Sequence, residues 1–100
     1  MTAERRSSDL PRGSFRQAQS TMSRRVGDDV VVAVAGREDF DFLSGPAATV
    51  WSMLDKPRSS ADLVDSLGRI YDIPARTIEE GVAKVLAHLV DRAALETSDE

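Results

Sequence analysis

Residues 30–54 have the sequence VVVAVAGREDFDFLSGPAATVWSML, and this stretch decides the fold. Residues 30–35 form an apolar run that is typical of a strand, and a polar break containing Gly36 follows it. Residues 39–43 alternate aspartate with phenylalanine, which is the period of a strand with two unlike faces. Ser44-Gly45-Pro46 then opens an amphipathic helix that carries the only tryptophan, Trp51.

Three short strands are predicted, over residues 22–26, 30–35 and 39–43. Turns of hairpin length that contain Gly27 and Gly36 join them, which predicts a three-stranded antiparallel sheet. The middle strand, residues 30–35, is apolar on both faces, and such runs are usually buried on both sides. Helices are expected to cover one face of the sheet. The other face is open to contact with the tail, a second copy or a partner.

The third strand is predicted to be an edge strand with unpaired backbone groups. Phe40 and Phe42 share one face, which is expected to pack, whereas Asp39 and Asp41 share the other. The aspartates fit ordinary protection of an edge against aggregation. They also fit a docking site where an extended peptide adds as a further strand, and both interpretations stay open.

Three helices are predicted after the sheet, and the fold class is therefore α+β, in a winged helix-turn-helix-like layout. The first helix extends to about residue 55, with Trp51 on its apolar face. The second begins at a capping-box pattern, residues 59–62, and ends near residue 71. The third runs from Pro74 to about residue 93, with Gly81, Lys84 and His88 flanking its apolar stripe.

Residues 1–21 are rich in Arg, Ser, Gln, Gly and Pro, and their apolar residues are isolated. Such a segment buries too little surface to offset the entropy of ordering, so a disordered basic tail is predicted. Residues 22–96 are predicted to form the domain, and residues 97–100 a flexible acidic end. Residues 26–100 hold seven Lys and Arg against fifteen acids, a balance that disfavours nucleic acid because phosphates need clustered cations.

Composition excludes most chemistry. The chain has no cysteine and one histidine, so neither a thiolate metal site nor a disulfide framework is expected. No phosphate-binding glycine motif, nucleophile elbow or paired catalytic carboxylates occur, and no cofactor is expected. The sequence predicts a non-enzyme. No apolar run reaches the length of a membrane span and no signal-peptide pattern opens the chain, which predicts a cytoplasmic protein without membrane contact.

The segment Phe42-Leu43-Ser44-Gly45-Pro46-Ala47-Ala48-Thr49-Val50-Trp51 resembles the strand-to-helix segment of the PqqD-like family. Residues 59–67, SSADLVDSL, resemble that family's second helix, Tyr71-Asp72-Ile73-Pro74 its connector, and residues 91–96 its closing motif. The resemblance covers about residues 22–96. This chain departs from the family pattern at Ala93, where glycine is frequent, and at Gly81, where an acid is frequent.

The resemblance implies a recognition element for ribosomally made, post-translationally modified peptides. In that family a precursor's leader adds as an antiparallel strand to the third strand, with apolar side chains between this strand and the third helix. The implied partner is a separate modifying enzyme or a transglutaminase-like leader protease, as in lasso-peptide biosynthesis. The implied peptide-binding residues are Asp39, Phe40, Asp41, Phe42, Leu43, Gly81, Lys84, Val85, His88 and Leu89.

Three alternatives remain. The first is a PqqD-type peptide chaperone that serves a radical enzyme in cofactor biosynthesis. The second is a winged-helix DNA-binding regulator, which the acidic second helix disfavours because Asp62 and Asp65 outnumber Arg69. The third is a structural or dimerisation module that uses the doubly apolar central strand.

Overall fold

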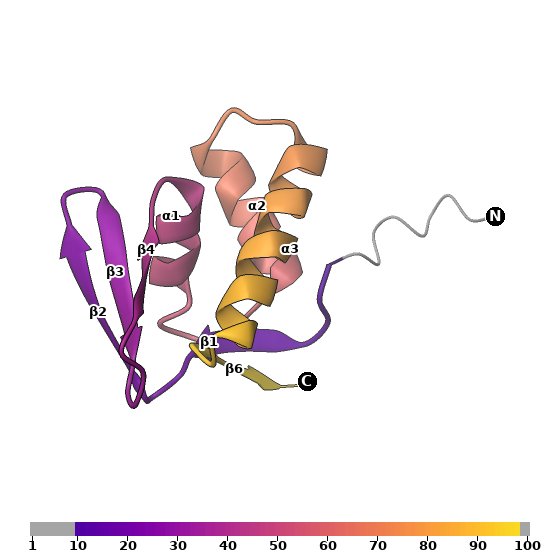
Figure 1. The fold of residues 1–100 in the computed structure, drawn as a ribbon. Helices are drawn as coiled ribbons and strands as arrows, with labels where there is room; N and C mark the ends of the chain where they lie inside the picture. Colours follow the sequence, from indigo (N-terminus) through magenta and orange to yellow (C-terminus); the bar gives the residue numbers. More distant parts are fainter. Residues whose placement is uncertain (1–9, 99–100) are drawn as a thin grey trace.

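The structure is a computed structural model that describes residues 10–98. Two three-stranded antiparallel sheets and three helices make up the fold (Figure 1), which confirms the predicted α+β class and the three helices after the predicted sheet. The elements are β1 (Ser14–Gln17), β2 (Thr21–Val26), β3 (Asp29–Val34), β4 (Phe40–Leu43), α1 (Pro46–Met53), β5 (Arg58–Ser59), α2 (Ser60–Ile70), α3 (Ala75–Asp91) and β6 (Leu95–Ser98).

The predicted sheet is β2–β3–β4, with β3 in the middle. Glycines with positive φ form its two turns, Gly27 at 65° and Gly36 at 89°, a backbone conformation that side chains disfavour. Cross-strand pairs such as Val32 opposite Asp41 set the register between β3 and β4. One face of this sheet packs against the helices, which all lie to the same side of it in Figure 1.

The second sheet, in the order β5–β1–β6, overturns part of the predicted domain boundaries. Residues 14–17 lie within the predicted disordered tail, yet they form β1, where Phe15 is only 4% exposed. β6 likewise includes Thr97 and Ser98 of the predicted flexible end, because Thr97 pairs with Phe15. Residues 1–9 and 99–100 of those two predictions lie outside the described residues.

Local signals position the three helices around one core. The Ser59 hydroxyl accepts a hydrogen bond from the Asp62 backbone N–H at 3.1 Å, which is the predicted cap of α2. Pro46 occupies the first turn of α1, where a missing N–H costs nothing. Trp51 is buried as predicted, together with Leu63, Leu86 and Leu89 of the neighbouring helices.

Candidate functional site

Strand β4 is the edge of its sheet. Within residues 10–98 it pairs with β3 alone, so its other side offers unpaired backbone N–H and C=O groups. Such an edge is a template for another extended chain. The strand leads directly into α1, and its side chains reach α3, so two helices flank the open edge.

Four charged or polar side chains join β4 and the residue before it to the C-terminal end of α3 and its cap residue; we call them the ion cluster: Asp39, Asp41, His88 and Arg92. Asp41 is central, with its Oδ1 2.8 Å from His88 Nε2 and its Oδ2 accepting a hydrogen bond from Arg92 Nε at 3.0 Å. Arg92 also pairs with Asp39 at 2.9 Å. The Asp41 side chain is 15% exposed, so these partners compensate a carboxylate that is largely removed from water.

The ion cluster changes the acidity of its members. Burial raises the pKa of the Asp41 carboxyl, but hydrogen bonds from His88 and Arg92 outweigh it and leave the pKa below its ordinary value. The hydrogen bond from Arg92 lowers the pKa of the exposed Asp39. Asp39, and then Asp41, raise the pKa of Arg92. Asp39, Asp41 and Arg92 are therefore held in their ionised forms.

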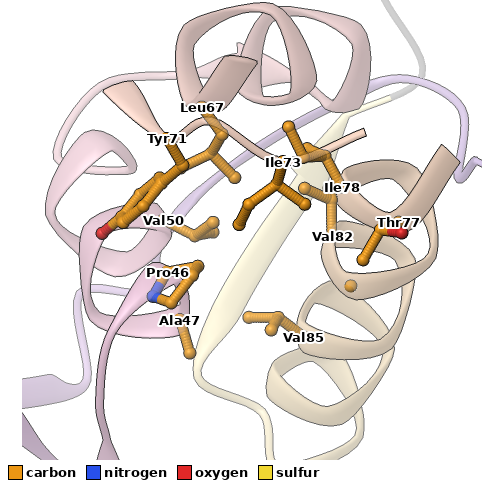
Figure 2. A pocket seen from close by; sticks show the side chains of 11 residues that line it. Pro46, Ala47, Val50, Leu67, Tyr71, Ile73, Thr77, Ile78, Val82 and Val85 are labelled. Atoms are coloured by element: carbon orange, nitrogen blue, oxygen red, sulfur yellow. The ribbon is translucent and has the colours of Figure 1, made fainter. Parts of the chain in front are cut away.

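An apolar pocket of about 190 Å³ opens farther along α3 (Figure 2). Residues from the start of α1, the end of α2, the α2–α3 connection and α3 line it: Pro46, Ala47, Val50, Leu67, Tyr71, Ile73, Thr77, Ile78, Gly81, Val82 and Val85. Tyr71 places its hydroxyl 2.9 Å from Thr49 Oγ1, so the polar end of this side chain has a partner. An apolar cavity of roughly 150 Å³ is enough for a benzene-sized group.

The apolar pocket and the ion cluster adjoin one another. Val85 lines the pocket and His88 belongs to the cluster, and residues three apart share a helix face. On the opposite wall, Asp41 lies in β4 and Pro46 begins α1. The open edge of β4 therefore has a charged region beside one end and an apolar pocket beyond the other.

Phe40 and Phe42 lie on the solvent-facing side of the sheet, whereas the sequence predicted that their face packs. They are 61% and 55% exposed, whereas Asp41 and Leu43 point toward the helices. The prediction that the phenylalanine face packs is wrong. The reason is that Leu43, buried at 7% exposure, shares the parity of the aspartates, and α3 supplies partners for their charge.

The other predicted site residues divide between surface and core. Gly81 and Val85 line the apolar pocket, and Lys84 is exposed on the same helix. The side chains of Leu43 and Leu89 are buried, Leu89 completely, so they belong to the core that underlies β4 and α3. The structure brings Asp39, Asp41 and His88 together in the ion cluster.

Sequence reasoning missed Arg92 and the helical lining of the pocket. Arg92 follows His88 by four residues, and this spacing places both on one helix face. Asp39 and Asp41 are two residues apart, which places them on one face of a strand, and His88 and Arg92 are four apart on a helix. This pair of spacings is a signal in the sequence for a cluster of opposite charges. Tyr71 and Ile73 of the pocket lie around a chain connection, and no periodicity marks their inward orientation.

Other chemistry finds little support in the described part of the chain. No group of three or more His, Cys, Asp or Glu residues within residues 10–98 is placed to hold a metal ion. No helix in the same range is both long and apolar enough to cross a membrane. On α2, Arg69 pairs with Asp65 at 2.8 Å, which leaves this helix without the free cations that a DNA-reading helix presents.

Residues 30–95 match the family model described as coenzyme PQQ synthesis protein D (PqqD). Among solved structures, the chain is similar to TbiB1 in complex with the TbiA(β) leader peptide, with a TM-score of 0.75 and 20% identity over 85% of this chain and 99% of that one. No curated protein matches the chain.

A second similar structure is the solution NMR structure of the PqqD truncation of Methylobacterium extorquens PqqCD. That protein is described as a functional and stand-alone recognition element for ribosomally synthesised and post-translationally modified peptides. The TM-score is 0.69 and the identity 20%, over 88% of this chain and 97% of that one. Likenesses at this identity show a shared fold.

Proposed function

The chain belongs to the PqqD family, and from this premise we propose that it binds the leader segment of a ribosomally synthesised precursor peptide. The leader adds as an antiparallel strand to β4, and the complex is presented to a separate enzyme. The open edge of β4 carries this proposal, since it lies beside an apolar pocket and two helices. A similar fold has a leader peptide as its partner in the TbiB1 structure, which supports the assignment.

Backbone pairing supplies affinity without selecting a sequence. Each hydrogen bond of the new strand contributes about 0.5–1.5 kcal/mol net, and a few of them roughly offset the ordering of a flexible leader. Selection among leaders must come from side chains. The apolar pocket accepts one aromatic or branched aliphatic side chain by its volume, about 190 Å³, and its apolar lining.

The proposed pairing also gives the leader a direction. β4 runs from Phe40 toward Leu43, and Pro46 at the pocket follows three residues later. An antiparallel guest runs the opposite way, so its N-terminal part lies near the apolar pocket and its C-terminal part near Asp39. We therefore place the apolar anchor residue of the leader N-terminal to the segment that pairs with β4.

The charged residues around the edge have distinct proposed tasks. Asp39 and Asp41 are already paired with Arg92, which reduces their attraction for a basic leader. The ion cluster is therefore proposed to be a rigid boundary of the binding site. Lys84 is exposed, with no ion-pair partner within residues 10–98, and it is proposed to receive an acidic leader residue. The main chain of residues 40–43, the backbone of Gly81 and the side chains of Val85 and His88 complete the proposed site.

The proposed role is binding and delivery without catalysis, in the cytoplasm. Delivery to a leader protease in a lasso-peptide type of pathway is our first assignment for the enzyme partner. The match to a family described by coenzyme PQQ synthesis favours a second candidate, in which the peptide is carried to a radical enzyme of cofactor biosynthesis. The genes beside that of this chain distinguish the two, because one pathway needs a protease and the other a radical enzyme.

The binding test uses a fluorescent synthetic peptide that copies the leader of the precursor encoded beside this chain. Val85→Asp places a charge in the apolar pocket and is expected to weaken binding at least about tenfold. Val90→Asp is the matched control, since Val90 is on the same helix, 42% exposed and outside the pocket lining. Equal affinities of the two variants would remove the pocket from the site.

The strand-addition mode has its own test. Single N-methyl groups are introduced at successive backbone nitrogens of the same peptide. In a strand, alternate N–H groups point to the same neighbour, so affinity is expected to fall at every second position of the paired segment. A loss of affinity without this period of two would show that the leader does not pair with β4 as a strand.

A further inference from the structure

The β2–β3–β4 sheet exposes an unusually apolar face. Six large apolar side chains are exposed within residues 10–98, and four of them belong to this sheet: Met22 at 74%, Val26 at 49%, Phe40 at 61% and Phe42 at 55%. Folded monomers seldom leave a contiguous apolar patch of this kind in water unless it binds something.

The strand register places these side chains on one face, the outer sheet face: Met22, Val26, Val31, Ala33, Phe40 and Phe42. Met22 is opposite Ala33, and Ala33 is opposite Phe40. Phe42 is opposite Val31, so the same side of the sheet continues along the strands. The other face carries Val30, Val32 and Leu43, which the helices bury.

The shape of the outer sheet face is self-complementary. Phe40 and Phe42 form a high ridge along β4, and beside it the small, half-buried Val31 and Ala33 form a lower strip along β3. A two-fold axis between these strands places the ridge of one copy over the lower strip of the other. An isologous contact requires this self-complementarity.

Area and charge also fit a second copy. A fully covered aromatic side chain buries about 150–250 Å², and Phe40 and Phe42 still expose 61% and 55% of theirs. With Met22 and Val26 the face supplies roughly 500 Å² and a pair of faces roughly 1,000 Å², the size of a weak interface. The face carries one cation, Arg24, and one anion, Asp29, because each pairs across strands with its apolar residues. The net charge of −4 of the whole chain is therefore not concentrated at the contact.

We propose that the outer sheet face is a self-association surface on which a second copy of this chain stacks face to face. The contact covers the face of the sheet and leaves the hydrogen-bonding edge of β4 free. Self-association of this kind therefore does not compete with a strand that adds to β4. The inference does not depend on the proposed leader binding.

Sedimentation velocity of the full-length chain, from about 5 µM to about 500 µM, tests the proposal in the range of weak, small interfaces. The mass is expected to double with concentration. The double variant Met22→Asp with Val26→Asp is expected to stay monomeric, with a dissociation constant raised at least about tenfold. Ile70→Asp is the control, because Ile70 is 59% exposed on α2 and lies outside the outer sheet face. This variant should dimerise like the wild type.

A dimer through some other surface would give a different pattern. If the double variant dimerises as well as the wild type, the proposal is wrong. NMR spectra recorded on dilution locate the contact surface. Chemical-shift changes are expected at Val31, Phe40 and Phe42 and not at Ile70. A mass that stays monomeric at every concentration also overturns the proposal.

Discussion

The two sheets have the same number of strands and the same antiparallel pairing, but they differ in how the chain builds them. In the β2–β3–β4 sheet, consecutive strands are joined by tight turns at Gly27 and Gly36. In the β5–β1–β6 sheet, the two ends of the domain meet, and Ser14 is opposite Ser98. The first sheet has an open edge and an exposed face, whereas the second ties the ends of the domain to its core.

Their aromatic residues show what this difference means. Phe15 of β1 is 4% exposed and belongs to the hydrophobic core, whereas Phe40 and Phe42 of β4 are more than half exposed. Hydrogen bonds beyond the strands strengthen the attachment of β1, since Gln17 N–H donates to Leu54 O at 2.8 Å and Ala18 N–H to Ala94 O at 2.9 Å. The terminal sheet thus contributes stability, and the hairpin sheet provides the surfaces to which we assign binding.

The largest expected effect separates the two sheets by stability. Phe15→Ala should lower the free energy of unfolding by about 3–5 kcal/mol, because it leaves a cavity in the core. Phe42→Ala should change it by less than about 0.5 kcal/mol, because the ring already contacts water. Urea denaturation followed by circular dichroism measures both, and similar losses would contradict the division.

Gly81→Ala should separate stability from binding in one residue. A Cβ at this position meets no atom within 4 Å, and alanine is favoured over glycine in a helix by about 0.8–1.0 kcal/mol. The same methyl group narrows the apolar pocket, so leader affinity should fall several-fold. Thermal unfolding and peptide titration give the two values.

Gly68→Ala is the matched control for that variant. Gly68 is an exposed glycine of α2, its Cβ would also meet nothing within 4 Å, and it is not part of the apolar pocket. It should stabilise the fold to a similar extent and leave affinity unchanged. A loss of affinity in both variants would point to altered helix dynamics in place of a filled pocket.

Ala93 connects α3 to the terminal sheet and has a φ of 63°, a left-handed conformation that costs alanine about 1 kcal/mol. Ala93→Gly should therefore raise the free energy of unfolding by about 0.5–1 kcal/mol. Ala87→Gly, on the exposed side of α3, should lower it by a similar amount. Thermal unfolding of the pair measures both signs, and two losses would argue against strain at Ala93.

The smallest expected effect concerns the ion cluster and pH. The pKa of Asp41 is lower in the folded protein than its ordinary value of about 3.9, so its ionised form stabilises the fold above pH 4, and this stabilisation is lost as pH falls below that value. Asp41→Asn should thus be less stable than the wild type at pH 7, and the difference should shrink at pH 3. A difference that is independent of pH would contradict this role of the carboxylate.

Much of the hairpin sheet and the helices was predictable because their signals are local. Gly27 and Gly36 mark the turns, Ser59 caps α2, and the apolar period of α3 identifies its buried face. Each of these features acts over a few residues, so the sequence alone specifies it. The predicted edge position of residues 39–43 follows from the same signals, because the helices begin directly afterwards.

The sequence by itself therefore determined the order of the three hairpin strands and the three helices, the buried tryptophan and the absence of thiol chemistry. Only the tertiary structure decided that β1 pairs with β6, and that the aspartates of β4 face α3 while its phenylalanines face water. Both decisions depend on partners far along the chain. The ends of the domain must meet before β1 has a neighbour, and Arg92 and His88 must reach β4 before a buried Asp41 is favourable.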